Sequence, residues 1–529
     1  MKIRSEIVRT YQAIHSWTGI STGLLLFICF FAGALTMFQS DIQRWADAGI
    51  HQVGGDAPTE VAELDALLRQ TIRQHQDSMD SISVALQGEG PLLSWHQGRP
   101  ELGSATELHY ASLNDGEVEY YAAHSNQLAK LIDELHRTAG IAGELGHEHL
   151  GVYVMGVAAI AYFLALVSGV IFLLPTLARS FLALRHNKGR FRFLLDTHNL
   201  VGVVSLPFHI IIAFTVVVFA FHDQFYAGLS AVYDDRPLFE HGQPDAAPYA
   251  IEQLPPLTEF IAVAGQQMPD YQLHGIHFSG LGTLRPSARL ELVNNDRMMI
   301  NPVGDILMLH PFTLQVTYST NPTGAEGIWG RVVSSFFSLH FGSYGGEWTR
   351  WVYFILGLGG AYLFYSGNLL WLEKRRQQKK SSPRVLSNMT ALTLGVCYGC
   401  MAGIASAMVI GRLWPLLPGT DGSQINAVYI GSYYLVFAGC VLWAFWRRAA
   451  RAVVELKRFC AATFAAIALV SWSAGLLPVG VLAQISSGSG WVLELLALAF
   501  AVVLLLSANH TRRSNQFAYC WRQAKLSGG

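Results

Sequence analysis

The stretch LDTHNLVGVVSLPFHIIIAFTVVVFAF, residues 195–221, decides the fold, because it is long and apolar enough to cross a membrane and still contains two histidines. An ionisable side chain at bilayer depth is costly and marks a functional site by default. His198 and His209 are eleven residues apart, so on a straight α-helix they lie on one face, about 20° and roughly 16.5 Å apart. Two stacked imidazoles in one span predict two metal centres in series.

The composition of the whole chain is that of a membrane protein. Of its 529 residues, 51% are hydrophobic and only 14% are charged, whereas a soluble chain carries about 25% charged residues. The expected fold class is therefore an α-helical polytopic protein in a lipid bilayer. Eight apolar runs predict spans: Ile20–Phe38, Val152–Leu174, Val201–Phe221, Trp351–Leu372, Ala391–Leu413, Ala427–Phe445, Cys460–Leu482 and Trp491–Ser507.

Basic residues are concentrated at one side of the predicted membrane. They precede the first span and follow every second span, as in the runs 185–192, 374–384, 447–458 and 512–513. By the positive-inside rule, both termini are cytoplasmic and the long segments 39–150 and 222–350 face outward. The net charge of −1 gives no indication of a nucleic-acid partner.

The two outward segments resemble each other. Each opens with a helical pattern of about four turns and continues with short alternating strands and tight turns. A repeated order of helix, domain and helix indicates an internal duplication. The predicted organisation is span one at 1–38, a first domain at 39–150, spans two and three at 151–221, a second domain at 222–350, span four at 351–376 and a C-terminal four-helix membrane region at 377–529.

The C-terminal four helices carry few chemical signals. Glu494 lies near the outer end of the last span, and we expect it to be solvated. The chain has no strand-borne G-x-G-x-x-G motif and no P-loop. If it moves electrons, its donor is therefore a separate molecule.

Histidines at the membrane boundaries predict the ligands. His15 and His198 lie at similar depth on the cytoplasmic side, where two helices can bring a bis-histidine pair to one metal or haem. His209 needs a partner from another helix. We favour His340, which lies among aromatic and small residues, with His136 and His149 as alternatives.

Several short motifs together resemble the PepSY-associated transmembrane helix family. They are HSWTGI at 15–20, LHRTAG at 135–140, LDTHNLVG and LPFH in the third span, and LHFGSYGG at 339–346. The resemblance covers roughly residues 1–376 and implies an inner-membrane protein of Gram-negative bacteria whose outward segments are two periplasmic α+β PepSY-like domains. It also implies b-type haem, one or two per chain, because some members are ferric-siderophore reductases.

The resulting functional hypothesis is a haem-dependent enzyme. Electrons from a quinol or a cytoplasmic reductase would pass from the His15–His198 site to a site with His209, and would reduce a ferric siderophore in the periplasm. Two other functions stay open on the sequence: a non-catalytic PepSY-type binding or regulatory protein, and a permease for a siderophore or metal.

Overall fold

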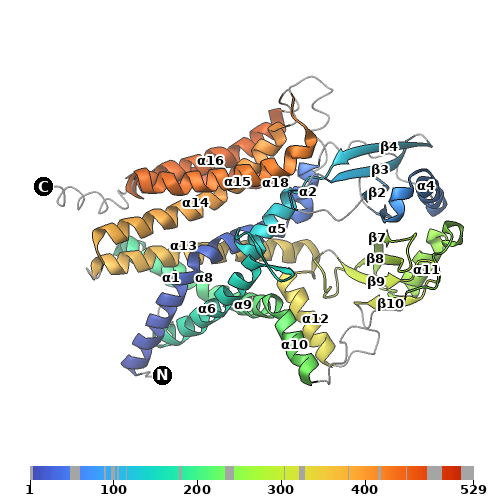
Figure 1. Cartoon of the computed structure of the whole chain (residues 1–529). Coiled ribbons are helices and arrows are strands. Elements are labelled where there is room, and N and C mark those ends of the chain that lie inside the picture. The colour runs from blue at the N-terminus through green and yellow to red at the C-terminus, as the bar shows by residue number, and fades with distance from the viewer. Residues whose placement is uncertain are drawn as a thin grey trace.

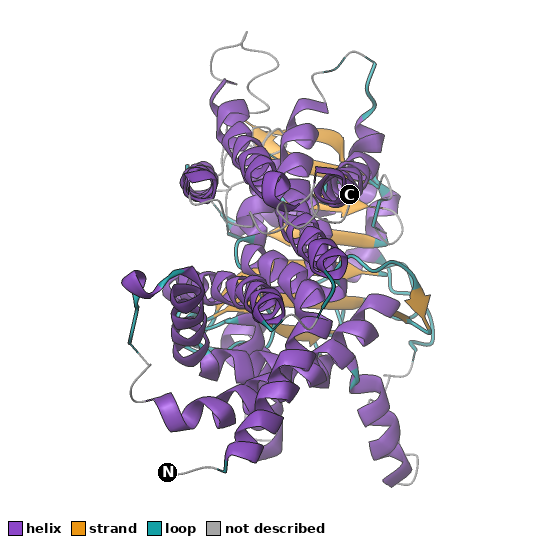
Figure 2. Cartoon of the chain, turned by 90° about the vertical axis from the view of Figure 1, so that its left-hand side faces the viewer, coloured by secondary structure: helices purple, strands orange, loops and turns teal. Residues whose placement is uncertain are grey.

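A computed structural model describes most of the chain. The described residues are 4–47, 60–87, 91–96, 102–103, 106–114, 116–177, 182–232, 244–302, 304–320, 328–378, 381–414, 417, 419–447, 449–473 and 491–513. A bundle of long helices occupies one end of the molecule and a β-sheet the other (Figure 1), so that a view along the bundle has helices in front of strands (Figure 2). Helix α1 begins at the end of the bundle opposite the sheet.

Long apolar helices make up the bundle. The spanning candidates are α1 (Ser5–Thr36), α6 (Leu150–Leu173, continued by a 3-10 turn to Thr176), α13 (Gly346–Gln377), α14 (Pro383–Leu413), α15 (Ile425–Arg447) and α18 (Val492–Arg513). A bent pair, α8 (Arg190–Val204) and α9 (Leu206–Ala220), makes a seventh span if its two pieces cross together. The seventh predicted span, Cys460–Leu482, starts in α16 (Ala449–Ser473), but its part beyond Ser473 lies outside the described residues.

The break between α8 and α9 changes the geometry expected for the third span. The two helix axes differ by 68°. Pro207 stands in the first turn of α9, and its missing N–H and its ring interrupt the helical bonding pattern there. Ser205, at the break, returns its hydroxyl to the Val201 carbonyl at 2.6 Å. The prediction that His198 and His209 share one face of a straight helix is therefore wrong.

The two long segments that the sequence predicts to face outward, 39–150 and 222–350, form one sheet between them. The first contributes β1 (Ser81–Ala85), β2 (Leu93–His96), β3 (Glu107–Asn114) and β4 (Glu117–His124); the second contributes β7 (Gln272–Ser279), β8 (Ser287–Val293), β9 (Asp305–Leu309) and β10 (Val316–Ser319). The strand order is β10-β9-β8-β7-β1-β2-β3-β4, and every neighbouring pair is antiparallel. Each half is a four-strand meander, and the halves meet where β1 pairs with β7.

One helix from each half covers the same face of this sheet. Helices α4 (Val61–Gln74) and α11 (Leu257–Gln267) bury their apolar stripes with inward side chains of the two central strands, such as Ile82 and Phe278. They lie on the side of the sheet away from the bundle (Figure 1). The repeated order of one helix and four strands is the internal duplication that the sequence indicates.

Short helices connect the sheet to the bundle. They are α2 (Gln39–Ala46), α5 (Leu128–Thr138), α10 (His222–Val232) and α12 (Ile328–Phe341), and a small hairpin of β5 (Glu144–Leu145) and β6 (Glu148–His149) precedes α6. The C-terminal helices are anchored to α2 through Trp45, whose indole Nε1 donates to Glu494 at 3.0 Å and whose ring lies 4.2 Å below the Arg412 guanidinium. Glu494 is only 5% exposed, so the expectation of a solvated carboxylate is wrong.

A disulfide between the two halves tests the shared sheet. Ser83 on β1 and His277 on β7 are register partners whose side chains are bonded at 2.9 Å. Cysteines at both positions should oxidise readily, because facing residues of antiparallel strands have the Cα separation that a disulfide needs. Peptide mapping by mass spectrometry without reductant detects the bond. The control pair E119C/E291C, on β4 and β8, should stay reduced; a free S83C/H277C pair would contradict the single sheet.

Candidate functional site

One pair of histidines lies at the end of the bundle away from the sheet. His15 of α1 and His198 of α8 have ring centroids 6.4 Å apart. The Nδ1 of His15 donates to the Ala165 carbonyl of α6 at 2.8 Å, and the Nδ1 of His198 is bonded to the Ser366 hydroxyl of α13, also at 2.8 Å. We call these two residues the inner pair. The structure therefore brings together the two histidines that the sequence matched by depth.

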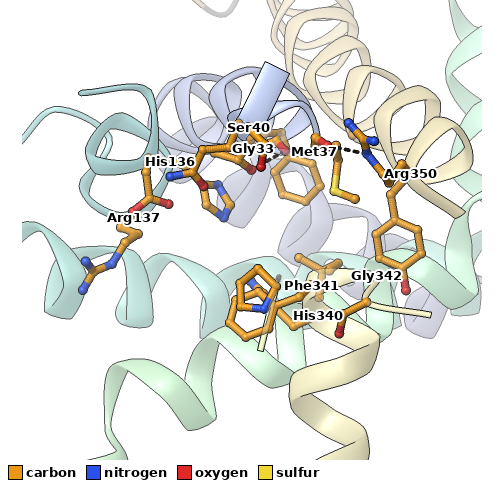
Figure 3. A pocket seen from close by; sticks show the side chains of 18 of the residues that line it. Gly33, Met37, Ser40, His136, Arg137, His340, Phe341, Gly342 and Arg350 are labelled. Carbon is orange, nitrogen blue, oxygen red and sulfur yellow. Dashed lines mark hydrogen bonds between the residues drawn. The ribbon is translucent and has the colours of Figure 1, made fainter. Parts of the chain in front are cut away.

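A second pair lies at the sheet end of the bundle. His136 of α5 and His340 of α12 have ring centroids 6.2 Å apart and lie on opposite sides of a pocket (Figure 3). The Nδ1 of His136 donates to the Cys29 carbonyl of α1 at 3.0 Å, and the Nδ1 of His340 is bonded to the Thr215 hydroxyl of α9 at 2.8 Å. We call His136 and His340 the outer pair.

His209 lies deep in the bundle and belongs to neither pair. Its ring packs against Phe30, Tyr162 and Phe208, and it is fully buried. Within the described structure neither ring nitrogen has a hydrogen-bond partner. Thr215, which holds His340, is six residues further along α9, or roughly 9 Å along the helix axis. The preferred pairing of His209 with His340 is thus not what the structure has, because His340 faces His136.

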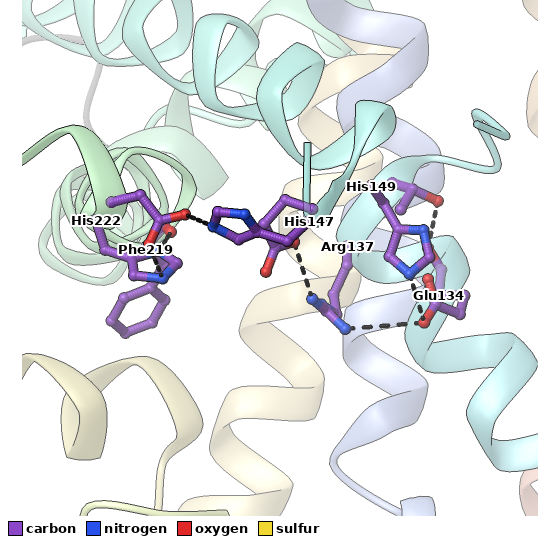
Figure 4. Close-up of polar contacts among 9 residues, drawn as sticks. Glu134, Arg137, His147, His149, Phe219 and His222 are labelled. Carbon is purple, nitrogen blue, oxygen red and sulfur yellow. Dashed lines mark hydrogen bonds and ion pairs between the residues drawn. The ribbon is translucent and has the colours of Figure 1, made fainter. Parts of the chain in front are cut away.

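His149 stays at the rim of the bundle. It stands just before α6 with its side chain 42% exposed, and its Nε2 lies 3.8 Å from a Glu134 carboxylate oxygen (Figure 4). Arg137 approaches the same carboxylate at 3.8 Å. His149 is therefore part of a surface ion-pair cluster, separate from the two buried pairs.

Glycines lie against the buried imidazoles. A Cβ on Gly33 would come within 2.5 Å of His136, one on Gly169 within 3.0 Å of His15, and one on Gly360 within 3.0 Å of His209. A Cβ on Gly367 would be 3.4 Å from His198. Gly360 belongs to the run GLGG at 357–360, which by sequence alone indicates only close packing of small residues in an apolar helix. The same glycines that let the helices pack closely also leave room for the histidine rings.

A cavity of about 1130 Å³ surrounds the outer pair. We call it the outer pocket. Its inner wall is apolar and includes Phe30 and Tyr162 of the bundle. Its rim is charged and includes Arg44, Arg137 and Arg350 together with Asp41, Asp47 and Glu347. A concave, largely apolar cavity with a few converging polar groups is typical of a ligand site.

The arrangement of the imidazoles limits what they can hold. A histidine whose Nδ1–H donates to a carbonyl keeps its lone pair on Nε2, and metal-binding histidines are usually oriented by such a bond. Among the described residues, no group of three or more His, Cys, Asp or Glu is placed to hold a bare metal ion. Two facing imidazoles supply two ligands, which is what an iron already held by four porphyrin nitrogens needs. Both pairs therefore fit a bis-histidine haem better than a bare ion.

The fold and the paired histidines define a class: polytopic membrane proteins with a histidine-containing helical core and a duplicated extramembrane sheet domain. Within that class, the family model described as PepSY-associated TM region matches residues 12–374, and the chain belongs to this family. The match confirms the resemblance drawn from the short motifs. No curated protein matches the chain. Helices α14, α15, α16 and α18 all lie beyond the matched region.

Replacing Gly33 by alanine tests the contact with His136. The new Cβ would overlap the imidazole, and overpacking of this kind costs about 1–3 kcal/mol. Gly19 lies on the same helix, and a Cβ there meets nothing within 4 Å. We expect G33A to lower the melting temperature in detergent and G19A to leave it unchanged or raise it, since alanine is the better helix former. Equal melting temperatures would contradict the close approach.

Asp47 lines the outer pocket, and its carboxyl makes the stability of the protein depend on pH. It follows α2 outside the spanning candidates, and burial raises the pKa of its carboxyl to about 7, opposed by a hydrogen bond from Gln43. Because this folded-state pKa lies above that of the unfolded chain, the contribution of Asp47 to stability falls as the pH rises from about 4 to about 7. We expect the melting temperature to fall less over this interval in D47N than in the wild type. Parallel curves would contradict the buried carboxyl.

Proposed function

We propose that this protein is a haem-dependent reductase of the bacterial inner membrane that passes electrons outward and reduces the Fe(III) of a ferric siderophore in the periplasm. The observation that carries the proposal is the set of four Nδ1 bonds, from His15 to Ala165, His198 to Ser366, His136 to Cys29 and His340 to Thr215. Each fixes an imidazole so that its Nε2 is the atom available to a metal.

The inner pair would hold one haem b and the outer pair a second. Bound haem supplies an iron that changes between the ferric and ferrous states at a potential set by its axial ligands and surroundings. The protein contributes two imidazoles at each position, brought by different helices. Phe30, Tyr162 and His209 pack together as an aromatic cluster within the bundle.

The distribution of basic residues supports electron transfer from the inner pair toward the outer pair. Arg185 and Arg192 pair with the buried Asp196 near the inner pair, at the end of the bundle opposite the sheet. By the positive-inside rule this end is cytoplasmic and the sheet is periplasmic. The donor, a quinol or a cytoplasmic reductase, would then meet the inner pair, and the chelate would meet the outer pocket.

The rim of the outer pocket suits an iron chelate. Arg44, Arg137 and Arg350 each lie in ion pairs with carboxylates of the protein, and a chelate with oxygen-rich anionic groups would compete for the same guanidinium donors. Reduction to Fe(II) weakens the hold of hard oxygen ligands, so the chelator releases the metal. The residues at the rim bind and orient the chelate; the imidazoles stay in the wall beneath it.

Visible spectroscopy of the purified protein tests the proposal. We expect a Soret band and sharpened α and β bands on dithionite reduction, and loss of about half of the haem in each of the variants H15A, H198A, H136A and H340A. H149A is the matched control and should keep both haems, because His149 lies outside the pairs. A colourless preparation would overturn the haem proposal and favour a binding protein or a permease.

His209 has a separate outcome in the same experiment. If H209A loses the outer haem while H136A keeps it, His209 rather than His136 is the ligand opposite His340. If H209A keeps both haems, the assignment to the outer pair stands. Low-temperature spectra of the single variants separate the two haems.

A further inference from the structure

A second cavity lies between the family region and the C-terminal helices. It measures about 360 Å³ and is much more apolar than polar. One wall comes from α1, α2 and α13, with Leu35 and Phe354, and the other from α14, α16 and α18, with Met408, Leu496 and Phe500. We call this cavity the slot. Half of its wall therefore belongs to helices that the family region does not contain.

One group of charged side chains lies between the slot and the outer pocket and lines both of them. Asp41, Arg44, Glu347 and Arg350 line both cavities. Arg350 forms ion pairs with Asp41 and Glu347, and Arg44 pairs with Asp41 at 2.5 Å. These are side chains of α2 and α13, partly exposed rather than sealed in the core. A molecule that enters from the charged rim thus meets the guanidinium and carboxylate groups of the rim on one side and the apolar slot on the other.

The position of the slot indicates which molecule it serves. In the proposed function the electron donor acts at the inner pair, at the opposite end of the bundle, so a cavity beside the outer pocket belongs to the substrate side. Apolar walls offer a polar chelate no hydrogen bonds, whereas an alkyl chain gains free energy from every methylene buried there. One molecule with a polar head and an apolar chain fits both compartments at once.

We propose that the slot binds the acyl chain of an amphiphilic ferric chelate whose iron-bearing head lies in the outer pocket. The proposal rests on the proposed function only for the identity of the head group. The ion pairs of Arg350 and Arg44 lie where the head of the chelate joins its chain. Helices α14, α16 and α18, which line the slot, then help to select the substrate by its chain.

A series of chelates with one head group and increasing acyl chain length tests the slot. Complexes of gallium(III), which is not reduced, separate binding from reduction. Affinity for the wild type should rise up to about fourfold per added methylene and then level off when the slot is full. The ferric complexes should show the same dependence in KM, with kcat unchanged.

Two substitutions on α18 give the matched comparison. Ala497 lines the slot and is 5% exposed, so A497F fills it, whereas Leu506 on the same helix is 64% exposed and L506F only changes the outer surface. A497F should abolish the chain-length dependence and leave the affinity for the chelate without a chain unchanged; L506F should behave as the wild type. Should A497F not fold, L496A widens the slot and should move the optimum to longer chains.

The outcomes separate the alternatives. Chain-length-dependent binding of the gallium complexes without any reduction of the ferric ones would support the slot and overturn the proposed function. Reduction that does not depend on chain length would support the function and overturn the slot. If a membrane phospholipid copurifies with the wild type and is lost in A497F, with no dependence on chelate chain length, the slot holds a lipid and the proposal is wrong.

Discussion

The hydrogen-bonding requirement of a buried imidazole organises this bundle. A neutral histidine ring has one donor and one acceptor, and leaving both without partners in an apolar interior is costly. Four other histidines, which are partly buried, meet half of this requirement through Nδ1, each with a partner on another helix. The same bonds that orient the rings therefore link α1 to α6, α8 to α13, α5 to α1 and α12 to α9. Among these histidines of the described structure His209 is the exception, because neither of its ring nitrogens has a hydrogen-bond partner.

Because the third span is broken into α8 and α9, its two pieces contact different helices. A straight helix would have placed His198 and His209 in one line, which serves two centres on a single face. The 68° bend after Val204 lets α8 deliver His198 to α1, and lets α9 direct Thr215 toward α12. Non-helical backbone inside a membrane is tolerated where it is buried in protein, as at this break, where Ser205 is only 3% exposed.

The sequence predicts the features that follow from local pattern. Hydropathy places the spans, charge places their ends, and the repeated order of helix and strands in the two outward segments indicates the duplication. The pairing of His340 with His136 depends on how α5 and α12 pack beside each other, which no spacing along the chain encodes. The pairing of β1 with β7 is likewise a contact between segments nearly 200 residues apart. Pro207 is a local signal that the sequence does offer, because a proline six residues into the apolar run Val201–Phe221 indicates a break as readily as a kink.

The buried polar cluster around Trp45 joins the C-terminal helices to the rest of the bundle. Burying a carboxylate and a guanidinium at a helix interface carries a desolvation penalty that apolar packing would avoid. Glu494 of α18 and Arg412 of α14 both contact the indole of Trp45, and these contacts offset part of that penalty. Helix α2 also carries Asp41 and Arg44, the partition between the two cavities. A polar contact that fixes α2 against α14 and α18 thus also fixes the position of the side chains that the slot and the outer pocket share.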